Sequence, residues 1–182
     1  EFLANVNDFA GSRQTYSQLA DGAVYGFSRP GVTVRCTFTP GHTPGSTSYI
    51  IDEKYMIAGD TIFIHSIGRP DLGGQVEAWS DRLFETLQKV KDFPDSLVIL
   101  PGHYMSWQEA DARLVFATTL AAAKASNEAI YALADKADFL AFIKSNMRQQ
   151  PAEYATIRQI NANLVQVDDD KAEELDLGKN EC

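Results

Sequence analysis

The chain has 182 residues, of which 45% are hydrophobic and 23% charged, and this suits a single globular domain. Its net charge of −9 and isoelectric point of about 4.7 argue against non-specific nucleic-acid binding, which needs clusters of lysine and arginine. No apolar stretch approaches the roughly 20 residues that a membrane-spanning helix needs. The chain begins Glu1-Phe2-Leu3 without a leader pattern, so a secretory signal is absent or has been removed.

The two cysteines favour a reducing environment. Cys36 lies inside an apolar run and Cys182 is the last residue. We expect a buried structural thiol at the first position and a free terminal thiol at the second. A cytoplasmic location follows as the prediction.

The first half of the chain predicts short strands. Residues 32–38 alternate apolar and polar side chains, which is typical of a strand with one buried face. Residues 47–51 and 54–58 predict a hairpin around Asp52 and Glu53. A short extended piece is expected at 62–64, and the glycine-rich segment 68–74 is expected to be a loop.

Helices dominate the predictions from the middle of the chain onward. Apolar residues recur every three or four positions between Val76 and Lys91, which predicts an amphipathic helix, and residues 97–100 predict a buried strand. From residue 107 we expect helices and no strand, with one helix around 139–147 and another around 154–164. The acidic residues 168–182 are expected to fray. Together these elements predict an α/β fold with a sheet covered by helices.

Three predicted strands end in small-residue turns that carry a metal-binding side chain. The tripeptide Pro-Gly-His occurs at 40–42 and again at 101–103, and Gly59-Asp60 follows the strand between them. Imidazole and carboxylate groups are ligands that divalent metals prefer. Sites in layered α/β proteins also lie at strand ends. The pattern therefore predicts a metal site built from His42, Asp60 and His103.

These motifs resemble the second half of the metallo-β-lactamase fold, in the branch that holds glyoxalase II and the persulfide dioxygenases. The residues that carry the resemblance are Thr39–Ser46, Gly59–Thr61 and Pro101–His103. The loop Gly68-Arg69-Pro70-Asp71-Leu72 is similar to the Gly-Arg-x-Asp loop of the dioxygenases, although Pro70 departs from their commoner residue. The resemblance implies an αββα sandwich, seen here mainly as its second half. The implied divisions are residues 1–106 for that half, 107–167 for a C-terminal helical extension and 168–182 for an acidic tail.

The resemblance also implies that further ligands come from elsewhere. The family's His-x-His-x-Asp-His motif is absent, and three histidines in the whole chain leave no place for it. We therefore expect the chain to be the C-terminal portion of a longer protein, or to pair with a separate N-terminal half.

The function that the resemblance implies first is an enzyme of sulfur metabolism. In a persulfide dioxygenase, His42 and Asp60 would bind one Fe(II) and act as the catalytic residues, with His103 nearby. The enzyme would oxidise glutathione persulfide, or another small persulfide, to sulfite with O2. Arg69, Asp71 and Tyr104 are the implied substrate-binding residues. Arg69 has an equal alternative, which is to pair with Asp71 and hold its loop.

Two other functions stay open from the sequence. The first is a glyoxalase II-like thioester hydrolase with Zn²⁺ or a dinuclear Zn/Fe site, in which Asp60 bridges two metals and His103 is also a ligand. The second is an inactive half domain that needs its missing half. The expected partners are a small thiol, persulfide or glutathione thioester, with a rhodanese-like domain or the N-terminal half in the full protein. A homodimer is a further expectation, and neither nucleic acid nor a membrane is expected as a partner.

Overall fold

The computed structural model describes residues 19–26, 31–147, 153–161 and 164–176. The described residues between 19 and 147 form one compact unit, and the described residues after 147 belong to a second. In the second unit the described elements are α6 (Tyr154–Asn161) and α7 (Asp169–Asp176), so part of the segment expected to fray is helical. None of the described helices is both long enough and apolar enough to span a membrane. The domain divisions implied by the resemblance stay predictions.

The first unit contains one mixed sheet of six strands in the order β1-β2-β3-β4-β5-β6. Neighbouring strands are antiparallel except for β4 and β5, which are parallel. A parallel pair needs a crossover, and α2 (Val76–Lys91) supplies it. The strands are β1 (Val24–Gly26), β2 (Thr33–Phe38), β3 (Thr47–Ile51), β4 (Tyr55–Gly59), β5 (Val98–Pro101) and β6 (Thr118–Thr119).

Most of the predicted elements are confirmed. Strands β2 to β5 and helix α2 lie within a residue or so of the positions predicted for them. The hairpin turn is also confirmed: Asp52 and Glu53 both have positive φ, of 50° and 54°, which is the type I′ pattern that matches strand twist. The Asp52 carboxylate accepts the backbone N–H of Thr33 at 2.8 Å and supports this turn. Cys36 is a buried free thiol as expected, while Cys182 lies outside the described residues.

Two of the predictions were wrong or incomplete. The region after residue 107, for which no strand was predicted, contains β6 as well as the short 3₁₀ helix η1 (Trp107–Glu109). The edge strand β1 was also missed. Both strands have two or three residues, too few to show a period-two pattern. The extended piece at 62–64 is limited to an isolated bridge between Ile62 and Ile67.

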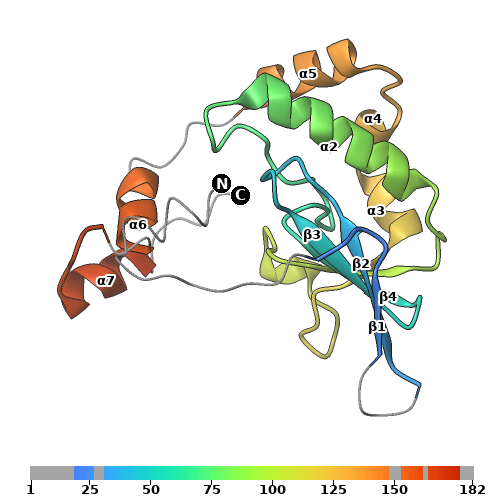
Figure 1. Cartoon of the computed structure of the whole chain (residues 1–182), viewed down its shortest axis with the longest axis horizontal. Helices are drawn as coiled ribbons and strands as arrows, with labels where there is room; N and C mark the ends of the chain where they lie inside the picture. The colour runs from blue at the N-terminus through green and yellow to red at the C-terminus, as the bar shows by residue number, and fades with distance from the viewer. Residues whose placement is uncertain (1–18, 27–30, 148–152, 162–163, 177–182) are drawn as a thin grey trace. The chain divides into compact units, whose positions relative to one another are not determined.

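Four helices lie together on one side of the sheet (Figure 1). Besides α2 they are α3 (Leu120–Ser126), α4 (Glu128–Tyr131) and α5 (Lys136–Ser145). One buried cluster joins β3, β4 and β5 to α2 and α3, and a second joins α2 to α4 and α5. This arrangement confirms the predicted α/β class. The first cluster includes Ile50, Met56, Ile99, Val90 and Leu120. The second cluster includes Leu83, Phe84, Leu87, Phe139 and Ile143.

The other side of the sheet is also apolar, but it is more exposed. Register pairs Tyr49 with Ile57, and Ile51 with Tyr55, on this side. Tyr55 and Ile57 are exposed at 46% and 44%, whereas Met56 between them is fully buried. One face of this sheet is thus buried under helices. The second face presents aromatic and branched side chains that suit packing against another layer.

Neighbouring residues of β4 allow a test of this asymmetry. We expect Met56→Ala to lower the free energy of unfolding of this chain by about 2–5 kcal/mol, because it empties a buried position. Ile57→Ala should cost well under half as much, because Ile57 is already largely solvated. Urea denaturation of the two variants measures the difference. Equal losses would contradict an open face.

Candidate metal centre

The sheet topology brings the three predicted ligand positions to one edge. Strands β2, β4 and β5 run in the same direction, since β3 is antiparallel to both β2 and β4, and β5 is parallel to β4. Their C-terminal ends therefore meet at the same edge of the sheet. His42 follows β2, Asp60 directly follows β4, and His103 lies two residues after β5.

The three side chains converge on one carboxylate oxygen. Asp60 Oδ2 lies 3.4 Å from His42 Nε2 and 3.3 Å from His103 Nε2. These separations exceed a typical hydrogen bond. Two atoms that each lie about 2.1 Å from a shared metal would be about 3.0 to 3.4 Å apart, depending on octahedral or tetrahedral angles. The spacing therefore fits neighbouring ligands of a divalent cation.

The backbone sets the orientation of His42. Its Nδ1 donates to the carbonyl oxygen of Arg69 at 3.0 Å, and the ring is thereby turned so that Nε2 faces Asp60. Metal-bound imidazoles commonly carry such a second hydrogen bond, because it selects the tautomer and orients the ring. An imidazole nitrogen and a carboxylate oxygen that face each other need a proton or a cation between them. The chemistry of this donor set therefore fits a metal.

His103 is held less tightly than His42. Its side chain is 40% exposed, against 10% for His42, and its ring makes an edge contact with Phe63 at a centroid distance of 6.2 Å. In the described part of the chain, no group of three or more His, Cys, Asp or Glu side chains closes into a metal-binding set. The arrangement is better described as two His–Asp pairs that share Asp60 Oδ2.

Close backbone packing supports the Asp60 carboxylate and requires glycine. A Cβ at Gly102 would overlap Asp60 Oδ1, and the Gly102 N–H donates to the Gly59 carbonyl at 2.8 Å. On the other ligand loop, Gly41 has φ +147° and packs against the backbone of Leu83 in α2, where a Cβ would also overlap. The glycine of each Pro-Gly-His motif thus allows a contact that a larger residue would prevent.

A buried chain of hydroxyl groups lies between the strands that carry the ligands. Thr61 Oγ1 donates to Thr39 Oγ1 at 3.0 Å, and Thr39 lies 3.0 Å from Ser48 Oγ. Ser48 in turn donates to the Ala58 carbonyl at 3.4 Å. All three hydroxyl residues are at most 1% exposed. Because buried hydroxyls are costly without partners, this chain fixes the ends of β2, β3 and β4 to one another.

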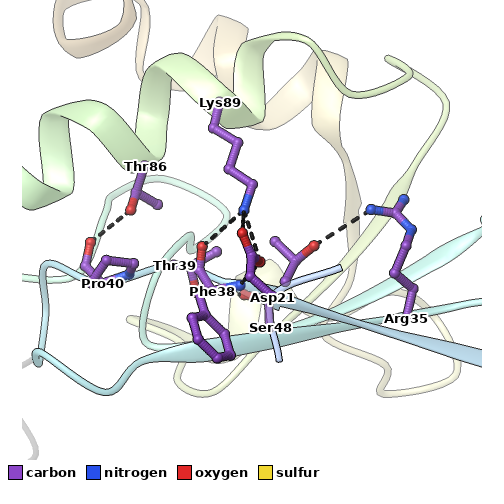
Figure 2. Close-up of polar contacts among 9 residues, drawn as sticks. Asp21, Arg35, Phe38, Thr39, Pro40, Ser48, Thr86 and Lys89 are labelled. Carbon is purple, nitrogen blue, oxygen red and sulfur yellow. Dashed lines mark hydrogen bonds and ion pairs between the residues drawn. The ribbon is translucent and has the colours of Figure 1, made fainter. Parts of the chain in front are cut away.

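Helix α2 is tied to the end of β2, as Figure 2 shows. Thr86 Oγ1 donates to the Pro40 carbonyl at 2.7 Å, and Lys89 Nζ donates to the Phe38 carbonyl at 3.3 Å. Lys89 also pairs with Asp21 at 3.0 Å. The backbone N–H of Phe38 and the charge of Lys89 lower the pKa of the Asp21 carboxyl below its usual value. The role of Thr86 was not predicted from the sequence, although a polar residue on the buried stripe of a helix indicates a specific hydrogen-bond partner.

The predicted substrate-binding residues lie beside the ligands. Arg69 pairs with Asp71 through two hydrogen bonds, Nε to Oδ1 at 2.8 Å and one terminal nitrogen to Oδ2 at 2.6 Å, so the loop-holding alternative is present. Tyr104 stacks on Phe116 with a centroid distance of 3.9 Å and an interplanar angle of 12°. Their contacts with substrate stay predictions.

No family model matches the chain, but curated proteins are similar to parts of it. Probable metallo-hydrolase YqgX of Bacillus subtilis is 43% identical over 68 residues, covering 36% of this chain and 31% of that protein. Glyoxylase B2 of Dictyostelium discoideum is 31% identical over 117 residues, covering 63% and 38%. Hydroxyacylglutathione hydrolase of Glaesserella parasuis is 33% identical over 90 residues, covering 48% and 36%. The chain thus spans about a third of the length of these relatives.

A solved structure of a metallo-β-lactamase from Staphylococcus aureus matches 81% of this chain and 44% of its own length, with a TM-score of 0.65 and 28% identity. The chain belongs to the metallo-β-lactamase superfamily. ETHE1 from Myxococcus xanthus matches 81% of this chain and 60% of its own, with a TM-score of 0.59. At 20% identity, that likeness supports the metallo-β-lactamase fold alone.

Gly102 offers a direct test of the candidate metal centre. Gly102→Ala places a methyl group on the Asp60 carboxylate, so we expect loss of most bound metal in the longest soluble form of the protein. Gly45→Ala is the matched control, because a Cβ at Gly45 meets nothing within 4 Å. Plasma mass spectrometry of both variants measures the metal. Retained metal in Gly102→Ala would remove Asp60 from the site.

Thr86 tests whether α2 supports His42. Thr86→Val keeps the shape but leaves the Pro40 carbonyl without its donor, so we expect a several-fold loss of metal affinity and about 1 kcal/mol of stability. Thr86→Ser keeps the hydroxyl and should retain metal affinity. Competition with a chelator and urea denaturation make the two measurements. Unchanged affinity in Thr86→Val would limit this contact to a structural role.

Proposed function

We propose that this chain supplies part of the active site of a persulfide dioxygenase-type member of the superfamily. The observation that carries the proposal is the contact between the Gly68–Asp71 loop and His42. The loop resembles the Gly-Arg-x-Asp loop of the dioxygenases, and its Arg69 carbonyl accepts the Nδ1–H of His42. The loop that carries the resemblance therefore contacts one of the proposed metal ligands.

The unequal settings of the two histidines also support this function. His42 is buried and oriented by a carbonyl, and with Asp60 it makes two members of a two-His-one-carboxylate set. His103 is more exposed and suits a neighbouring role. Fe(II) held by such a set would supply activation of O2. The third ligand would come from outside this chain.

The overall reaction balances as a persulfide plus O2 and water giving a thiol, sulfite and two protons. The sulfur–sulfur bond breaks, the outer sulfur is oxidised and O2 is reduced. Within this chain, His42 and Asp60 would hold the metal, and Tyr104 would line the approach for the organic part of the persulfide. A rhodanese-like domain in the full protein is proposed by analogy alone.

A thioester hydrolase of glyoxalase II type is the second candidate, and a different observation favours it. Asp60 Oδ2 lies 3.4 Å from His42 Nε2 and 3.3 Å from His103 Nε2, so Asp60 would serve as a ligand together with either histidine if two metals were bound. The named relatives include a metallo-hydrolase and a hydroxyacylglutathione hydrolase. In this function His103 would be a direct ligand.

A third candidate is that the chain alone is inactive. Two or three ligands at one sheet edge bind a divalent metal less strongly than a complete set. The exposed Tyr55 and Ile57 on the second sheet face are consistent with a missing layer. A metal assay of this chain, beside the longest soluble form of the protein, tests this candidate. Metal in the longer form alone would support it.

His103→Ala separates the two enzymes in the longest soluble form of the protein. A dioxygenase should keep about one iron per chain and still consume O2 with glutathione persulfide, at a reduced rate. A hydrolase should drop from two metals to one and lose turnover of S-lactoylglutathione. Asp60→Asn is the control that should remove metal and activity in either case. Wild-type protein with two zinc ions and no O2 consumption would contradict the dioxygenase.

A further inference from the structure

We propose that the Arg69–Asp71 ion pair positions His42 as a metal ligand and does not clamp the substrate. The proposal rests on the proposed metal site, but it is independent of which reaction that site performs. Both residues then have a positioning role, in which they act on His42 through the loop and do not touch the substrate or the reacting atoms.

Arg69 and Asp71 form a buried, bidentate ion pair. The Arg69 and Asp71 side chains are 11% and 3% exposed, and they meet through two parallel hydrogen bonds of 2.8 Å and 2.6 Å. Arg69 therefore presents to Asp71 the same bidentate edge that would grip a substrate carboxylate. A buried pair of this kind is costly to break, since removing one charge leaves the other uncompensated.

The loop that the pair braces lies directly against both ligands. The Arg69 carbonyl accepts His42 Nδ1–H at 3.0 Å, and the Gly68 N–H donates to the Thr61 carbonyl at 3.2 Å. A Cβ at Gly68 would overlap the Asp60 carbonyl oxygen and touch His42 Cβ. The loop can occupy this place only with glycine at position 68 and with the following residues held in one conformation.

The consequence for His42 is a fixed tautomer. Side-chain pairing between Arg69 and Asp71 holds the peptide unit whose carbonyl selects Nδ1–H. Nε2 then faces Asp60 Oδ2 at 3.4 Å. Loss of a group that orients a metal ligand in this way commonly lowers metal affinity about 10- to 100-fold. The ion pair thus acts on the metal through the loop backbone.

The test uses Asp71→Asn, with ¹⁵N NMR of the imidazoles in metal-free protein and zinc affinity by chelator competition. We expect the Nδ1–H tautomer of His42 to be lost or mixed, and zinc affinity to fall about 10- to 100-fold. Asp71→Glu, which keeps a carboxylate for Arg69, should restore much of both. If Asp71→Asn does not fold, Arg69→Lys is measured instead, because lysine keeps the charge without the bidentate fork.

Glu53→Gln is the matched control. Glu53 makes a bidentate pair with Arg35, with distances of 2.9 Å and 2.6 Å, at the hairpin turn on the opposite end of β4 from Asp60. Its loss should leave the His42 tautomer and zinc affinity unchanged. If Asp71→Asn also leaves both unchanged while raising KM for the substrate, the pair is a clamp and the proposal is overturned. Failure of the dioxygenase assay would not alter either readout.

Discussion

The parallel pairing of β4 with β5 is the constraint on which the candidate metal centre depends. It requires the crossover through α2, and it places the end of β5 beside the end of β4. The antiparallel hairpins on the other side of β4 bring the end of β2 to the same edge. His103, Asp60 and His42 therefore meet although they are up to 61 residues apart in the sequence. Without this parallel pair, the end of β5 that leads to His103 would not lie beside Asp60.

Contacts with the backbone orient these candidate ligands. The Arg69 carbonyl fixes the His42 ring, and Gly102 leaves room for the Asp60 carboxylate. Thr86 and Lys89 of α2 hold the carbonyls that precede His42. Because such contacts join rigid elements, a ligand can keep its direction without crowding the side on which a metal would bind.

The two faces of the sheet connect the fold to the question of function. One face is closed by α2 to α5 and supplies a rigid platform. The other presents Tyr55 and Ile57 at its surface, and among the described residues no group of three or more His, Cys, Asp or Glu side chains forms a metal-binding set. Both features are consistent with the proposal that residues outside this chain complete the site.

The sequence by itself determined the longer elements, the fold class and the family, because periodic burial and the repeated Pro-Gly-His motif are properties of residue order. Helix α2 shows this best, since its apolar spacing predicted both of its ends. Only the tertiary structure decided the direction of the His42 ring, the pairing of Arg69 with Asp71 and the support from Thr86. It also decided β1 and β6, whose few residues depend on a neighbouring strand. Arg69 and Asp71 are only two residues apart, and there the sequence left open whether the guanidinium would meet Asp71 or a substrate. For His42, Thr86, β1 and β6 the deciding partner is distant in sequence, and the direction of a backbone group depends on the folded path of the chain and not on residue type.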